Sequence, residues 1–225
     1  MAVVHHDVVR VFVDDRGRHG NALAIVDGLL VNAADRQAVA AALGFSETVF
    51  VDDVERGRVQ IFTPAVELPF AGHPTVGVAW WLAQEGHDVG RLEVPAGEVL
   101  VERDGAVTRV RARPEWTPAF IWHEMGSEVE VEAADPSEYT TGQHYLWAWT
   151  DRERGALRSR MFAPAMGIVE DEATGAAAIA LTARQGRALD ITQGRGSRIA
   201  TTSQADGWAT VGGRVLLEGH RTIER

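Results

Sequence analysis

Three side chains of the chain could transfer protons: Glu47, His73 and Asp171. Glu47 lies between Phe45 and the apolar run 49–51, a junction at which we expect a carboxyl group to be partly buried. Burial disfavours the charged form and raises the pKa of a carboxyl group toward the range in which it can both take up and release a proton. These residue types predict general acid–base chemistry. For Glu47, a solvated loop glutamate is the alternative.

His73 and Asp171 each stand beside the start of a predicted helix, one opening around Gly72 and the other around Gly175. The first N–H groups of a helix lack intrahelical acceptors, and the helix dipole adds partial positive charge there. A glycine has no Cβ, so a ligand could come close to the backbone at either opening. Two such openings facing each other predict a cradle for an anionic group such as a carboxylate. Two tightly turned helix caps with nothing bound are the alternative.

The two helix openings belong to a repeated pattern in the chain. Residues 62–86 and 162–186 align without a gap, and both have a Phe-x-Pro-Ala start, an apolar helix-like run and a closing Gly. Self-similarity of this kind indicates a duplicated half-domain and two similar lobes that face each other. We expect residues 1–114 to form an N-terminal lobe and residues 115–225 to form a shortened C-terminal lobe.

Hydrophobic periodicity predicts an α+β chain with mostly antiparallel strands and few helices. A helix over 33–43 is expected to end at Gly44. A second helix over 75–84 is apolar nearly all round, which predicts that strands wrap around it. The acidic segment 124–143 predicts no long helix. The predicted strands are 7–13, 22–26, 49–52, 59–63, 91–94, 98–102, 107–113, 119–122, 144–150, 157–162, 190–192, 198–202, 208–211 and 214–218.

Composition excludes several classes of function. The net charge of -10, with no clustered basic face, argues against a nucleic-acid partner. The chain has no cysteine, which excludes disulfides and thiolate nucleophiles, and all of its basic residues are arginine, which excludes a Schiff-base lysine. No run approaches the roughly 18 apolar residues of a membrane span, and no signal peptide is visible at the N-terminus. We therefore expect a cytoplasmic protein without a membrane partner.

A metal site built from histidines is a further alternative. It would need three or four donors that converge on one point. The spacings of the histidines match no usual ligand pattern, so we expect no metal. The histidines are His5, His6, His19, His73, His87, His123, His144 and His220.

Several segments together resemble the PhzF-like phenazine biosynthesis family, over about residues 7–218. The resemblance implies the diaminopimelate-epimerase-like fold, in which two pseudo-symmetric lobes each wrap an antiparallel β-barrel around a central helix. The active site of such a fold lies in the cleft between the lobes. The segments that carry the resemblance are Gly20-Asn21 with 22–26, Ser46-Glu47-Thr48 with 49–51, Phe62-Thr63-Pro64, 68–75 with its Gly72-His73-Pro74 block, Met161-Phe162-Ala163-Pro164, 170–175 and Gln193-Gly194.

The resemblance also implies a function. Members of the superfamily isomerise or epimerise small carboxylates without a cofactor, and the phenazine-pathway member moves a proton on dihydro-hydroxyanthranilate with a glutamate in a Ser-Glu-Thr context. Carried over to this chain, Glu47 is the acid and base, with His73 and Asp171 as its partners. The implied assembly is a homodimer. The residues expected to bind the substrate are Asn21, Gly72, Thr174, Gly175 and Ala176.

The chain also departs from the family pattern. Ala176 stands where the family has a serine, Ala22 stands where it usually has a proline, and the second half is short around 124–143. The leading hypothesis is a cofactor-independent isomerase of a small carboxylate-bearing substrate. The alternative is a non-catalytic binding homologue that has lost turnover. Such a protein would keep its ligand affinity with Glu47 replaced by glutamine and would show no activity in either form.

Overall fold

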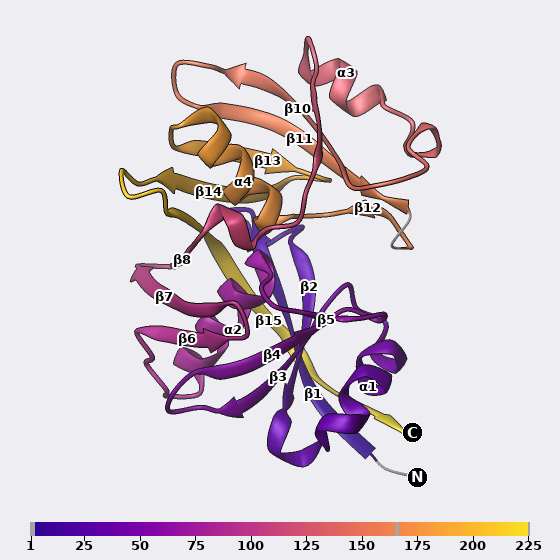
Figure 1. Ribbon diagram of the computed structural model, residues 1–225, viewed down its shortest axis with the longest axis vertical. Helices are drawn as coiled ribbons and strands as arrows, with labels where there is room; N and C mark the ends of the chain where they lie inside the picture. Colours follow the sequence, from indigo (N-terminus) through magenta and orange to yellow (C-terminus); the bar gives the residue numbers. More distant parts are fainter. Residues whose placement is uncertain (1–2, 165–166, 225) are drawn as a thin grey trace.

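The computed structural model describes residues 3–164 and 167–224, and its two lobes are stacked along the long axis of the molecule (Figure 1). Ala165 and Met166, which belong to the second copy of the predicted repeat, lie outside the described residues. The two termini lie close together at the far end of the first lobe (Figure 1). This arrangement follows from the last strand, which returns from the second lobe to pair with the first strand.

Eight strands close into a barrel in the first lobe, in the order β1-β2-β3-β4-β6-β7-β8-β15, and β15 pairs back onto β1. Helix α2 fills this barrel, and most of its residues are buried because they are apolar on nearly every side. The elements are β1 (Val3–Val13), β2 (Asn21–Asp27), η1 (Gly28–Leu30), η2 (Ala33–Asp35), α1 (Arg36–Leu43), β3 (Thr48–Asp53), β4 (Arg58–Phe62), β5 (Glu67–Leu68), α2 (Gly72–Gln84), β6 (Arg91–Val94), β7 (Gly97–Asp104) and β8 (Val107–Ala112).

In the second lobe the sheet continues from β15 through β14, β13, β11 and β10 to β9. Helix α4 packs against β14 and β15. Within the described residues β9 pairs only with β10, so this sheet stays open where the first lobe closes. The elements are η3 (Pro114–Trp116), β9 (Ile121–Glu124), α3 (Glu128–Ala133), η4 (Pro136–Glu138), β10 (His144–Asp151), β11 (Ala156–Ala163), β12 (Ile168–Asp171), α4 (Gly175–Gln185), β13 (Leu189–Gln193), β14 (Ser197–Ser203) and β15 (Ala209–Glu224).

The lobes repeat the same succession of elements. In each lobe, two strands form an antiparallel hairpin, a helix follows, and the next strand pairs in parallel with the second strand of the hairpin. These elements are β3, β4, α2 and β6 in the first lobe and β10, β11, α4 and β13 in the second. A parallel pair joined through a helix precedes each hairpin, β2-α1-β3 in one lobe and β9-α3-β10 in the other. The α+β class and the two-lobed architecture are therefore confirmed.

Two features differ from a pair of purely antiparallel barrels. Four strand pairs are parallel, because each of them is connected through a helix and such a crossover returns the chain in the same direction. The second barrel is an open sheet in the described residues. The irregular segment between β8 and β9 contributes to the cavity described below.

Strand β15 is one long strand where two were predicted. Gly212 and Gly213 were expected to interrupt it, yet both pair within the ladder. A Cβ on Gly212 would lie 2.6 Å from the Thr108 carbonyl oxygen, and one on Gly213 would lie 2.6 Å from the Phe12 ring. These glycines therefore serve close packing between strands. Strand β15 lies in the first barrel although it belongs to the second half of the chain. We therefore propose that the lobe boundary after residue 114 applies only to the part of the chain that precedes β15.

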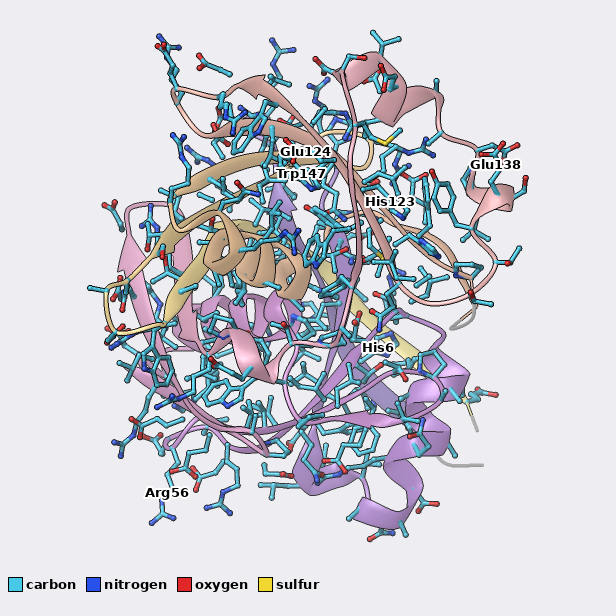
Figure 2. All side chains as sticks on the ribbon, turned by 45° about the horizontal axis from the view of Figure 1, so that its top comes forward. His6, Arg56, His123, Glu124, Glu138 and Trp147 are labelled. Atoms are coloured by element: carbon cyan, nitrogen blue, oxygen red, sulfur yellow. The ribbon has the colours of Figure 1, made fainter. Side chains whose placement is uncertain are left out.

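Most predicted elements lie within a few residues of the observed ones. Helix α1 ends at Gly44, which has a φ of 71° and so supplies the expected left-handed cap. Helix α2 begins at Gly72, three residues before the predicted start. Trp147 lies in the core of the second lobe, whereas Arg56 projects from the opposite end of the molecule (Figure 2). No helix in the described residues is long and apolar enough to cross a membrane.

Candidate active site

A cavity of about 240 Å³ is lined by residues of both lobes. Its walls are mainly apolar, and two carboxyl groups, Glu47 and Asp171, face it. Among the described residues, no arginine or histidine lines it. The lining residues are Glu47, Leu68, Pro69, Phe70 and Ala71 from the first lobe, and Trp116, Thr117, Pro118, Phe120, Gln143, Met161, Ile168, Asp171, Thr174 and Ala176 from the second.

Glu47 immediately precedes β3, and this strand fixes its backbone at the edge of the cavity. Its Oε2 atom has no hydrogen-bond partner and lies 3.6 Å from Nε2 of His73, which also has none. Burial raises the pKa of Glu47 to about 7, and the Ser46 hydroxyl offsets only part of this rise. A carboxyl group with such a pKa can take up and release a proton near neutral pH.

His73 is the second residue of α2 and is only 3% exposed. Burial lowers its pKa to about 4, and the charge of Asp171 and a hydrogen bond to the Ala22 backbone oppose this change only in part. The imidazole is therefore neutral near pH 7. It lies beside Glu47 without forming an ion pair with it and without lining the cavity.

Asp171 is the last residue of β12 and holds the second carboxyl group of the cavity. Burial and the neighbouring charge of Glu47 raise its pKa to about 6. Two donors counteract this rise: the Thr174 hydroxyl at 2.5 Å and the Asn21 side-chain amide at 2.7 Å. Asn21 is thus buried behind Asp171 and connects β2 of the first lobe to the second lobe.

The two predicted helix openings meet end to end. A Cβ on Gly72 would lie 2.6 Å from the carbonyl carbon of Gly175, and one on Gly175 would lie 2.9 Å from the backbone nitrogen of His73. The glycines therefore let the two helices approach each other, and neither glycine lines the cavity. Thr174 and Ala176, on either side of Gly175, do line it.

Replacing Gly72 by alanine should destabilise the fold, because the new methyl group would meet backbone atoms that cannot rotate away. We expect a loss of about 1–3 kcal/mol in the free energy of unfolding, which is typical of overpacking. Urea denaturation would measure it. Gly90→Ala is the matched control, since a Cβ there has no neighbour within 4 Å. Equal stabilities of the two variants would contradict the close contact of the helices.

The structure thus brings four of the predicted site residues to the cavity: Glu47, Asp171, Thr174 and Ala176. The other four, His73, Asn21, Gly72 and Gly175, lie directly behind them. The role of each of these eight residues in binding or catalysis stays a prediction.

Sequence reasoning missed the residues that shape the cavity. Phe70, Trp116 and Phe120 form much of its apolar wall. Phe70 belongs to the 68–75 segment, but nothing in the sequence distinguishes the three as cavity residues from aromatic residues of the core. Gln193 was noted only as part of a family signature, although its buried amide contacts both Asp171 and Thr174. Its place in the Gln193-Gly194 signature, directly after the predicted strand 190–192, was the only signal for it.

The histidines are dispersed over both lobes, with His6 in β1 and His123 in β9 (Figure 2). His123 and His144 stack with ring centroids 5.3 Å apart. In the described parts of the chain, no three histidine, aspartate or glutamate side chains are grouped as they would be around a metal ion.

Comparison with known protein families gives one match that covers most of the chain. The family model described as "phenazine biosynthesis-like protein", PhzC-PhzF, matches residues 9–144 and 140–206. The trans-2,3-dihydro-3-hydroxyanthranilate isomerase of Pseudomonas aeruginosa is 32% identical in sequence, over 71% of this chain and 71% of its own length.

Solved structures agree with the fold. A phenazine biosynthesis protein of the PhzF family from Enterococcus faecalis superposes with a TM-score of 0.79 at 19% identity, over 100% of both chains. A hydroxyproline epimerase from Agrobacterium vitis superposes with a TM-score of 0.67 at 12% identity, over 99% of this chain and 91% of its own. These similarities confirm the diaminopimelate-epimerase-like fold.

Proposed function

The chain belongs to the phenazine biosynthesis-like PhzC-PhzF family of isomerases, and from this membership we propose that it moves a proton on a small carboxylate-bearing substrate by acid–base catalysis in the cavity between its lobes. One observation carries the proposal. Glu47 has a carboxyl oxygen without a protein partner and faces a cavity with apolar walls. Its raised pKa of about 7 suits a group that must act as base and then as acid.

The reaction proceeds in two proton transfers that leave the enzyme unchanged. Ionised Glu47 takes a proton from a substrate carbon, and the electron pair of the broken C–H bond moves through an adjacent double bond. Glu47 then returns the proton to a different carbon of the same molecule, so that no oxidant, reductant or cofactor is needed. Neutral His73, 3.6 Å from Glu47, helps to orient the protonated carboxyl group.

The lining of the cavity supports a substrate with one carboxylate and an otherwise apolar body. Among the described residues, no basic side chain is present to bind a second anionic group. The carboxylate is instead bound by the first N–H groups of α4, which have no intrahelical acceptors and carry partial positive charge. The apolar wall around Phe70 and Trp116 excludes water from the reacting carbons and strengthens these interactions.

The first candidate substrate is trans-2,3-dihydro-3-hydroxyanthranilate, which the name of the Pseudomonas relative supplies. The chain should be incubated in D₂O with this compound and with a panel of small cyclic and amino carboxylates. Mass spectrometry and NMR would then detect deuterium uptake or an isomerised product. No exchange with any compound, together with thermal protection by several of them, would favour the non-catalytic binding homologue. A homodimer and a cytoplasmic location stay predictions.

Ala176 offers a direct test of how the carboxylate is bound. A serine at this position would place a hydroxyl donor on the cavity wall, beside the start of α4. A hydrogen bond to a charged group contributes about 1.5–3 kcal/mol, so we expect Ala176→Ser to lower KM for the true substrate by about tenfold or more. Steady-state kinetics would measure the change, with Ala183→Ser on the exposed side of α4 as control. An unchanged KM would place the carboxylate elsewhere in the cavity.

A further inference from the structure

Gln193 is the last residue of β13 and is completely buried behind the cavity. Its Nε2 atom donates to the Asp171 carbonyl oxygen at 3.0 Å, and its Oε1 atom accepts from the Thr174 backbone N–H at 3.2 Å. A carbonyl can only accept and a backbone N–H can only donate, so these two contacts leave the amide a single possible orientation. In that orientation, Nε2 also donates to the Thr174 hydroxyl oxygen at 2.8 Å.

The fixed amide determines the direction of the next hydrogen bond. Because the Thr174 hydroxyl accepts from Gln193, its own proton is free to point at Oδ2 of Asp171, 2.5 Å away. The other oxygen of Asp171 accepts from Asn21 at 2.7 Å. Asp171 thus receives a donor on each oxygen, which favours its ionised form. Glu47 has an unpartnered oxygen and receives comparatively little such support.

We propose that Gln193 is a positioning residue that holds the Thr174 hydroxyl as a donor to Asp171, which keeps Asp171 ionised and leaves Glu47 as the cavity carboxyl group that takes up a proton. The inference rests on the proposed function in that it takes Glu47 as the group that carries the substrate proton. Gln193 itself touches neither the cavity nor Glu47. It acts only by setting the direction in which the Thr174 hydroxyl donates its hydrogen bond.

The other titratable groups around Asp171 do not take over the role of Gln193. Glu47 precedes β3 and faces Asp171 as a like charge, which raises the pKa of Asp171. His73 in α2 is neutral near pH 7. Tyr145 in β10 lies 3.2 Å from Oε1 of Gln193, and its pKa is raised far above 10 by burial, so it stays protonated. Arg158 in β11 lies beyond Tyr145 and donates to the backbone carbonyls of Ser159, Thr192 and Gly194.

The proposal can be tested on the ligand-free protein by ¹³C NMR titration of the carboxyl groups of Glu47 and Asp171. In the parent protein the pKa of Glu47 should exceed that of Asp171. Gln193→Met has a similar length but no donor, so the Thr174 hydroxyl loses its fixed polarity. We expect the pKa of Asp171 to rise by about one unit and that of Glu47 to fall, as loss of a hydrogen bond to a charged group implies.

Two further variants separate this role from a general structural one. Thr174→Val removes the donor itself and should shift the two pKa values in the same direction. The double variant with Gln193→Met should then shift them no further, because both changes break one chain of hydrogen bonds. Tyr145→Phe removes the hydroxyl contacts to Oε1 of Gln193 and to the Ser159 hydroxyl but keeps Nε2 and the Thr174 hydroxyl, so it should leave both values unchanged.

Unchanged titration of Gln193→Met, or shifts that add fully in the double variant, would overturn the proposal. If Gln193→Met does not fold, Gln193→Glu preserves the shape of the side chain and replaces Nε2 by an oxygen. In that variant the gap between the two pKa values should close or reverse, and a gap equal to that of the parent would overturn the proposal equally. No substrate is needed, so failure of this inference is distinct from failure to detect isomerisation.

Discussion

Glu47→Gln is expected to lower kcat/KM for isomerisation by a factor of about 10² to 10⁴, the usual contribution of one general acid–base group. Glutamine has nearly the same shape but cannot accept a proton from carbon. Because both transfers pass through Glu47, deuterium uptake from D₂O and product formation should be lost together. Glu98→Gln, at an exposed position of β7, is the control and should retain full activity.

Binding measurements decide what the loss of activity means. The Glu47→Gln variant should still bind the substrate carboxylate, because the start of α4 is unchanged. We therefore expect ligands to raise the melting temperature of both proteins by similar amounts. Exchange that persists in the variant at the parent rate would show that another group carries the proton.

The same substitution should make the protein more stable at alkaline pH. Folded Glu47 keeps its proton up to a pKa of about 7, whereas the unfolded chain releases it near the ordinary glutamate pKa of 4.5. The folded state therefore binds more protons between these two values, and its stability falls as the pH rises through this window. Glutamine does not titrate. From the difference between the two pKa values, we expect Glu47→Gln to be more stable than the parent by about 3 kcal/mol at pH 8.

Urea denaturation at pH 4 and at pH 8 would measure this effect. At pH 4 the two proteins should be nearly equal, since Glu47 is then protonated in both the folded and the unfolded states. Asp171 adds to the difference at pH 8, because the charge of Glu47 raises its pKa in the parent. A variant that is less stable than the parent at both pH values would contradict the burial of an unpartnered carboxyl group.

The two expectations for Glu47 have one physical cause. An acid that is useful for proton transfer near pH 7 must be held where its charged form is poorly solvated, and such a position costs stability once the group ionises. In this structure the cost in stability arises at Glu47, which lines the cavity and whose Oε2 atom has no hydrogen-bond partner. The neighbouring Asp171 is instead surrounded by donors from Asn21 and Thr174.

Much of the fold could be predicted because its signals are local. The αL cap at Gly44 and the buried helix after Gly72 each depend on a few consecutive residues. The long strand β15 could not be predicted in the same way. Gly212 and Gly213 resemble a break in the sequence, and only their contacts with Thr108 and Phe12 show why glycine is required there.

For the site, the sequence by itself determined which titratable side chains stand beside the two helix starts and before β3. The repeat placed His73 and Asp171 at matching helix starts, and the apolar neighbours of Glu47 predicted a buried carboxyl group. The tertiary structure decided how these groups act together. Close contact of Gly72 with Gly175 brings the two lobes together.

The tertiary structure alone also set the environment of each acid. Asp171 accepts hydrogen bonds from Asn21, which is distant in the chain, and from its near neighbour Thr174, whereas the Oε2 atom of Glu47 has no partner. Residue types and their spacing specify which acids are available. The pKa of each acid depends on burial and on partners that only folding brings near.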